Sequence, residues 1–389
     1  MIRGGYGIFY DLAIIGNNLF FVRTGPPFQR PQTFDAGILP ADLTLSDPFP
    51  SVRLAASPMF DAPSIDPSFR DAYIQHWNLG YQRQLPENML FEVSYVGNKG
   101  TKLVRTVDVN QAYLVPGFNQ PEVQPRRPLP AFGSVPVLQG SGSSIYHALF
   151  GRLQRRFGAG LSFLASYTYG HAIDDSNGGN VAQDARNLKM DRGSSDFDAR
   201  QRFVLSYIYE LPFGRRRAFG TNWGTTLERL LGGWEFSGIA TFQSGRPIFI
   251  QLSPANQNSN TGSTRDRPNI AYIVDYKIVQ TTADPVITNR NDKTVYLNPA
   301  AFAIPPRGTF GNVPRNYFDG LSTNNWDLML AKNFRKEGLN VQFRTEFFNA
   351  FNHPSLNQPN RFFDATSFGT ITSTLFENRQ IQFGLKINY

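Results

Sequence analysis

The sequence contains no cysteine, which excludes a disulfide framework, a cysteine zinc cluster and a thiol nucleophile. It also lacks any apolar run of the roughly 20 residues that a membrane-spanning helix needs. The longest candidate, Phe163–Ala172, is interrupted by serine, threonine and glycine. Aromatic residues nevertheless make up 14% of the chain. They are therefore spread among polar residues, as in a sheet with one apolar face.

Few residues suit catalysis or metal binding. The four histidines are too dispersed for a zinc pair at helical or hairpin spacing, and no nucleophile–base–acid set stands out. The group Asp191, Asp196 and Asp198 could hold calcium, but it lacks the spacing of an EF-hand. We therefore predict that the chain is not an enzyme and carries no cofactor and no metal.

The formal net charge of +8 raises the question of a nucleic acid partner. The lysine and arginine residues, however, are scattered along the chain rather than gathered into a stripe. This distribution favours charge dispersed over loops and a lumen, and we expect no nucleic acid partner.

Strict alternation of apolar and polar residues is the main structural signal. Residues 380–389 carry apolar side chains at odd positions and polar side chains or glycine at even positions. Residues 339–347 repeat the pattern, with Arg344 and Glu346 on the polar side. Successive strand side chains point to opposite faces, so each segment predicts a strand with one apolar and one polar face. Burying Arg344 and Glu346 in a soluble core would be costly, and the polar face must therefore contact water.

The same pattern predicts about ten strands, most of them close to the length that crosses a bilayer at a tilt. They lie near residues 2–10, 74–85, 89–95, 144–157, 161–170, 203–211, 233–245, 325–334, 339–347 and 380–389.

Short turns and long polar connections nearly alternate between these strands. The short turns are Pro86–Asn88, Phe157–Gly160 and Lys336–Gly338. The long connections, expected to be loops without regular structure, are 11–72, 106–143, 173–200, 246–323 and 352–378. Outer-membrane barrels have short periplasmic turns and long extracellular loops, so both chain ends are predicted to be periplasmic. The exception is 212–231, a longer basic link on the short-turn side that contains three consecutive arginines, Arg215, Arg216 and Arg217.

A soluble β-sandwich also alternates, but long strands with long polar loops on one side favour a membrane barrel. Aromatic residues at or near strand ends add support, because such rings suit the headgroup region. They are Tyr10, Trp77, Tyr95, Tyr169, Tyr209, Trp234 and Trp326. The predicted fold class is all-β, an antiparallel up-and-down transmembrane β-barrel located in the outer membrane.

Several segments resemble the TonB-dependent receptor family, and more narrowly its Oar-like branch. They are Arg3–Asp11, Ser94–Gly100, Ser166–Gly170, Glu210–Gly214, Leu231–Trp234, Gln243–Pro247, Gly308–Asn312, Phe343–Pro354 and Arg379–Gly384. Members of this family are plugged barrels of about 22 strands, and they import bulky substrates such as iron chelates, vitamins or glycans. The resemblance implies that residues 1–389 are a partial barrel domain, the C-terminal part of a larger barrel.

The first residues lack the features of a signal peptide, although an exported protein needs one. We therefore expect a fragment without its plug and its N-terminal carboxypeptidase-regulatory-like domain, so that TonB would be contacted only through missing regions. Two other functions stay open. One is a surface adhesion or structural barrel without transport, and the other is a small passive porin-like barrel.

The predicted site residues lie on the two last strands. Lumen-facing candidates are Arg344, Glu346, Gln382 and Lys386. By resemblance, Phe383 and Tyr389 are the C-terminal assembly signal, which pairs with the barrel-assembly machinery through an open strand edge. The remaining expected partners are outer membrane lipid and an extracellular ligand that the sequence does not identify.

Overall fold

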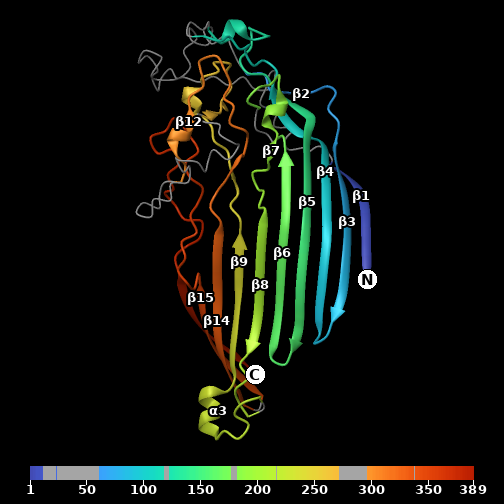
Figure 1. The fold of residues 1–389 in the computed structure, drawn as a ribbon, viewed down its shortest axis with the longest axis vertical. Helices are drawn as coiled ribbons and strands as arrows, with labels where there is room; N and C mark the ends of the chain where they lie inside the picture. The colour runs from blue at the N-terminus through green and yellow to red at the C-terminus, as the bar shows by residue number, and fades with distance from the viewer. Residues whose placement is uncertain are drawn as a thin grey trace, which may run out of the picture.

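A computed structural model describes residues 1–11, 23, 61–117, 122–176, 182–215, 217–270, 296–336 and 338–389. Its main feature is a curved antiparallel sheet in which ten long strands follow one another in chain order (Figure 1). These are β1 (Ile2–Asp11), β3 (Ala72–Leu85), β4 (Met89–Asp108), β5 (Pro136–Gly158), β6 (Leu161–Asp174), β8 (Gln201–Glu210), β9 (Trp234–Gln243), β14 (Thr323–Lys336), β15 (Leu339–Phe348) and β16 (Gln380–Asn388). The predicted strand number and antiparallel order are confirmed.

The strand register places all apolar rows on one face of the sheet. Phe203 pairs with Phe242 and Leu205 with Ala240, and the rings of Phe203 and Phe242 lie 6.1 Å apart. The intervening Ser206 belongs to the opposite, polar face. Because antiparallel partners point to the same side, the alternation within each strand becomes one apolar surface across the sheet. The opposite surface carries the polar rows, together with some apolar residues such as Ile208 and Ile239.

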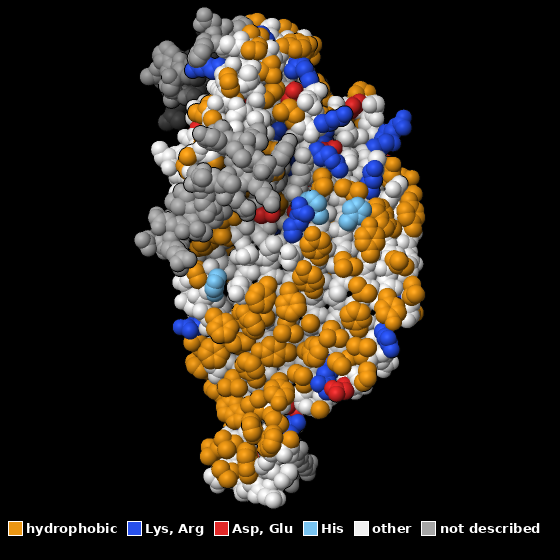
Figure 2. Space-filling model, in the orientation of Figure 1, with side chains coloured by type: hydrophobic (Ala, Val, Ile, Leu, Met, Phe, Trp, Pro, Cys, Tyr) orange, Lys and Arg blue, Asp and Glu red, His pale blue; other side chains and the backbone are white. Residues whose placement is uncertain are grey.

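The apolar face is exposed. Leu79 on β3 is 59% exposed and Phe383 on β16 is 67% exposed, and Figure 2 shows apolar side chains spread over a broad area of the strands. Soluble monomers rarely expose an apolar surface this large, whereas a lipid-facing sheet requires one. Within the described ranges, no helix has both the length and the apolar character to span a membrane.

The short turns have the predicted hairpin chemistry. Glu87 and Asn88 both adopt positive φ, at 59° and 58°, as a tight turn between twisted strands requires. Ala159 and Gly160 form the second turn, again with positive φ. In the third turn, Glu337 lies outside the described residues.

The connection predicted at 106–143 is shorter than expected, because both neighbouring strands extend into it. β4 has 20 residues and β5 has 23, and their pairing continues through Val107 and Val137. Two short strands, β2 (Ser64–Ile65) and β7 (Gly193–Ser194), add to β5 and β6 at this end. The sheet therefore reaches well beyond the length that a bilayer requires.

The expectation of loops without regular structure is wrong for the last two long connections. Their described parts, residues 244–270, 296–322 and 349–379, form what we term the cap. It contains the strand pairs β10 (Pro247–Ile248) with β13 (Phe318–Asp319) and β11 (Asn269–Ile270) with β12 (Phe302–Ala303). A hydrophobic core joins them, built from Ile248, Ile250, Leu297, Ala301, Phe302, Val313, Phe318 and Phe368. The predicted connection 11–72 falls largely outside the described residues.

The other elements are short. The 3-10 helices η1 (Gln124–Arg126), η2 (Leu188–Asp191), η3 (Pro254–Asn256) and η5 (Pro299–Ala301) lie in the long connections. The helix α3 (Thr225–Leu231) lies in the basic link at the opposite end of the sheet (Figure 1).

Candidate functional site

The four predicted lumen-facing residues lie together on the polar face of the two last strands. In the register of β15 and β16, Glu346 is opposite Gln382 and Arg344 is opposite Gly384. The Nε atom of Arg344 is 3.3 Å from Oε1 of Glu346. A Cβ atom at position 384 would lie 2.8 Å from that Nε, so the glycine leaves room for the guanidinium group. Lys386 follows on the same face of β16, since successive even positions share a side. Contact of these residues with a plug or solute stays a prediction.

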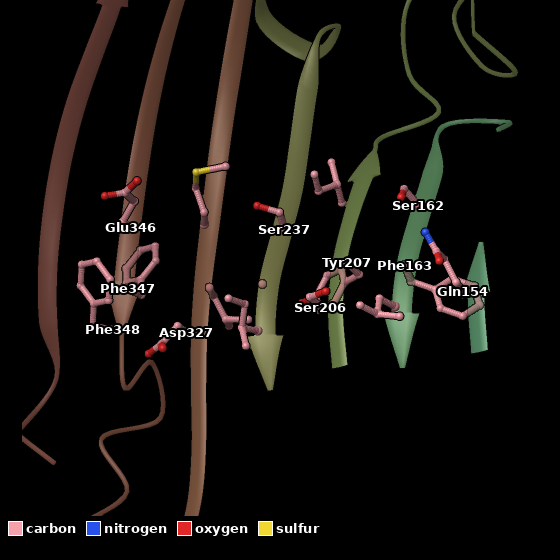
Figure 3. Close-up of a pocket in the computed structure, with 16 residues that line it drawn as sticks. Gln154, Ser162, Phe163, Ser206, Tyr207, Ser237, Asp327, Glu346, Phe347 and Phe348 are labelled. Atoms are coloured by element: carbon pink, nitrogen blue, oxygen red, sulfur yellow. The ribbon is translucent and has the colours of Figure 1, made fainter. Parts of the chain in front are cut away.

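A cavity of about 420 Å³ opens on the polar face across β5, β6, β8, β9, β14 and β15 (Figure 3). Its polar lining consists of Gln154, Ser162, Ser206, Ser237, Asp327 and Glu346. Among these residues, the sequence prediction named only Glu346. The other residues occupy polar positions of the alternating pattern, but their assembly into one cavity follows from the register of six strands. The cavity provides hydroxyl, amide and carboxylate groups beside apolar side chains such as Leu164, Ile239 and Met329.

Buried ion pairs join the cap to the sheet. Arg315 is almost fully buried and its guanidinium group forms an ion pair with Asp174 at the end of β6. The same group donates to Asp196 Oδ1 at 3.2 Å and to the carbonyl of Asp191 at 3.1 Å. A buried ion pair of this kind is strongly destabilised when one partner is removed, because the other charge stays buried. Arg315 therefore fixes the position of the cap above the sheet.

The suggested calcium group has other roles. Asp191 pairs with Arg267 at 2.6 Å, and Asp198 pairs with His171 at 3.0 Å and Arg200 at 3.1 Å. Together with the bond from Asp196 to Arg315, each carboxylate has a cationic partner of its own. In the part of the chain that the structure describes, no group of three or more histidine, aspartate or glutamate residues could hold a metal. In the structure these three carboxylates are therefore engaged by different cations rather than gathered around one point.

Burial perturbs charged groups inside the cap. It raises the pKa of Asp266, and hydrogen bonds from the backbone N–H and hydroxyl of Ser259, at 2.6 and 2.9 Å, partly oppose this rise. Burial also lowers the pKa of the neighbouring Arg267, which its pairing with Asp191 partly offsets. Both shifts follow from the burial of these groups in the cap interior, which disfavours their charged forms.

The predicted assembly signal lies at the edge of the sheet. Phe383 is on the apolar face, and its ring stacks on that of Phe343 with 6.2 Å between centroids. Tyr389 follows the end of β16 and is fully exposed. Among the described strands, β16 pairs only with β15, so one edge of β16 is open. Recognition of this strand by the assembly machinery stays a prediction.

A family model described as outer membrane beta barrel domain matches residues 1–382, while a comparison with curated proteins found no match. Among solved structures, the chain is similar to the outer membrane transporter YddB from Escherichia coli, with 10% identity, a TM-score of 0.41, and 82% of this chain and 33% of that chain covered. It is similar to the ferric-catecholate import receptor Fiu from K12 E. coli, with 11% identity, a TM-score of 0.42, and 100% and 32% covered.

A third similar structure is the pyoverdine outer membrane receptor FpvA from Pseudomonas aeruginosa PAO1, with 12% identity, a TM-score of 0.39, and 82% of this chain and 30% of that chain covered. The chain thus spans about a third of the length of these proteins.

Proposed function

The chain belongs to the outer membrane beta barrel domain family, and from this premise we propose that it is the C-terminal barrel portion of a TonB-dependent receptor. In its complete form, this receptor would bind a bulky substrate of the iron chelate, vitamin or glycan type and import it across the outer membrane. Residues 1–389 would form one partial barrel domain, and contact with TonB would belong to regions outside this chain.

One observation carries the proposal: among the described residues, the sheet of ten long strands does not close on itself. In the described residues β1 pairs only with β3, and β16 only with β15. A bilayer cannot hydrogen-bond the free N–H and C=O groups of such edges, so both strands need partners in the membrane. Together with the motif resemblance, the two edges favour an arc of a large barrel over a small closed one.

The two faces and the cap supply the parts that such a receptor needs. The polar face, with Arg344, Glu346, Gln382 and Lys386, would surround a plug or a passing solute. The cap lies at the end with the long connections, which is the extracellular side in outer-membrane barrels. A folded cap with fixed side chains is better suited to selecting a ligand than a flexible loop, because less entropy is lost on binding.

Cysteine pairs can test whether the sheet closes on itself, and the cysteine-free chain makes each engineered disulfide unambiguous. Gly5→Cys on β1 is combined in turn with Gln382→Cys, Gly384→Cys and Lys386→Cys on β16, in the full chain folded in lipid vesicles. We expect no disulfide within one molecule, because β1 and β16 are the two opposite edges of an arc and do not meet. The matched control is Glu346→Cys with Gln382→Cys, whose positions are direct partners and should cross-link.

Efficient cross-linking of β1 to β16 within one molecule would contradict the proposal. It would establish a closed barrel of ten strands and favour the passive porin-like alternative. Swelling of vesicles in small sugars would then be expected, since a small closed barrel without a plug would admit such solutes.

A further inference from the structure

The basic link between β8 and β9 has a structure that a simple turn does not need. We term residues 211–233 the rim segment. It contains four arginines and one glutamate and includes α3, which lies beyond the strand ends on the short-turn side (Figure 1). Arg216 lies outside the described residues. Because short turns are periplasmic in outer-membrane barrels, the rim segment lies next to the periplasmic leaflet.

The C-terminal end of α3 is fixed to the apolar face of the sheet. The indole N–H of Trp234 donates to the carbonyl of Leu230 at 3.0 Å. The Lys332 ammonium donates to the same carbonyl at 3.4 Å and also to that of Gly232. Trp234 and Lys332 are direct partners in the register of β9 and β14, and the ammonium lies 5.3 Å from the ring centroids of both Trp234 and Phe334. A cation at these carbonyls stabilises the helix end.

One side of the rim segment is apolar and exposed. Leu227, Leu230 and Leu231 have the i, i+3, i+4 spacing of one helix face, and all three are exposed. Beside α3, the ring of Phe213 stacks on Trp223 and contacts Phe219. Figure 2 shows apolar side chains of the strand region continuing onto this end of the molecule. The apolar surface of the rim segment is thus continuous with the lipid-facing surface of the sheet.

Charged groups lie on the other side of the rim segment. Arg215 and Arg229 are both exposed. Arg215 is held in place because its Nε donates to the carbonyl of Trp223 at 2.8 Å and its Nη2 to Thr225 Oγ1 at 3.2 Å. Glu228, the glutamate of the segment, accepts a bond from the Arg215 backbone N–H at 2.8 Å. Arg217 forms an ion pair with Glu210, just outside the segment. The exposed Arg215 and Arg229 therefore supply positive charge on the side of the segment opposite the leucines.

We propose that the rim segment lies in the headgroup layer of the periplasmic leaflet and binds anionic phospholipid. The leucines enter the boundary with the acyl chains, the aromatic rings lie at headgroup depth, and the arginines bind lipid phosphate. The proposal depends on the position of the sheet in the outer membrane and not on transport. It also explains why this connection is longer than the other turns on its side of the barrel.

Spin labels on single cysteines test the orientation of α3. Leu230→Cys is compared with Thr225→Cys, which lies on the opposite side of the same helix. The full chain is folded in vesicles of phosphatidylcholine with an equal part of phosphatidylglycerol, and folding is checked by heat-dependent gel migration. We expect the Leu230 label to be more accessible to oxygen and less accessible to a water-soluble nickel chelate than the Thr225 label. Equal accessibility of both labels to the nickel chelate would overturn the proposal.

The charge of the lipid is tested with Arg229, which is exposed on the helix surface. We expect the spin label at position 230 to lie deeper in vesicles that contain phosphatidylglycerol than in vesicles of phosphatidylcholine alone. Depth is measured from the accessibility of the label to oxygen and to the nickel chelate. Arg229→Gln should reduce this shift, whereas Arg229→Lys should retain it. If phosphatidylglycerol causes no shift, or if the glutamine variant keeps it in full, anionic lipid is not bound here.

Discussion

The sheet and the cap place similar side chains in opposite environments. In the sheet, large apolar residues such as Leu79 and Phe383 point outward and are exposed, while polar residues share the inner face. In the cap, Phe302 and Phe318 are buried with their ring centroids 5.5 Å apart, and charged residues surround them. The sheet therefore has the inverse arrangement of a soluble protein, and the cap has the ordinary one.

The difference follows from the solvent that each region meets. The apolar face of the sheet is stabilised by lipid, so its side chains need no protein partner. The cap lies in water and must make its own apolar core, and it also buries charges that are tied in pairs. Substitutions should therefore change stability for different reasons in the two regions: by exposing unpaired buried charges in the cap, and by placing charge against lipid in the sheet.

The largest effect is expected from Arg315→Met in the cap. This change leaves Asp174 buried without its cation and should destabilise the cap by about 3–5 kcal/mol, while the sheet stays folded. Hydrogen exchange in detergent would show faster exchange in residues 246–270 and unchanged protection in β6 and β8. The matched control is Arg307→Met, because Arg307 is exposed. Loss of protection in the whole sheet would mean that cap and sheet are one cooperative unit.

The next effect is expected in the sheet, from two adjacent residues of β8. Leu205 lies on the apolar face near the middle of the strand, and Leu205→Arg should cost about 2–4 kcal/mol in a bilayer. Ser206→Arg should cost much less, since Ser206 lies on the opposite face of the sheet and lines the cavity there. Denaturant unfolding in phospholipid vesicles measures both free energies. Equal costs for the two variants would contradict the assignment of the faces.

The smallest expected effect is a loss of cap stability at acidic pH, caused by protonation of Asp364. Asp364 accepts hydrogen bonds from the Ser253 backbone N–H at 2.7 Å and from Asn256 Nδ2 at 2.6 Å. Burial alone would raise its pKa, but these bonds outweigh burial and hold the pKa below its ordinary value of 3.8. Asp364 therefore stabilises the cap above pH 3.8, and this contribution is lost as the pH falls through the lowered pKa.

Hydrogen exchange of the cap at neutral and acidic pH tests this dependence. In the Asp364→Asn variant, the loss of cap protection between neutral and acidic pH should be smaller, because this side chain no longer titrates. An identical loss of protection in both proteins would assign the acid effect to another group.

Much of the sheet could be predicted from the sequence because its signal is local. The alternation of Leu205 with Ser206 and of Phe343 with Arg344 fixes which face each side chain occupies, whatever the neighbouring strand. Turn residues such as Asn88 also indicate a tight turn from the sequence alone, since asparagine and glycine adopt positive φ more readily than other residues. The four lumen candidates followed from this pattern and share one face of the sheet; that this face lines a lumen stays a prediction.

The cap could not be predicted in the same way. The ring centroids of Phe302 and Phe368 lie 5.5 Å apart although the two residues belong to different connections. Arg315 forms its ion pair with Asp174 of β6, which is far away in the sequence. No periodic pattern marks these residues. Likewise, α3 is too short to give a helical signal, and its attachment to Lys332 depends on the pairing of β9 with β14.

The sequence by itself determined a ten-strand antiparallel sheet with one lipid-facing and one water-facing surface. The reason is that successive side chains of a strand point to opposite faces, so neighbouring residues already show the pattern. Only the tertiary structure decided the core of the cap, the cavity across six strands and the attachment of the rim segment. These features depend on contacts between residues far apart in the chain, and such contacts exist only once the register of the sheet has brought the connections together.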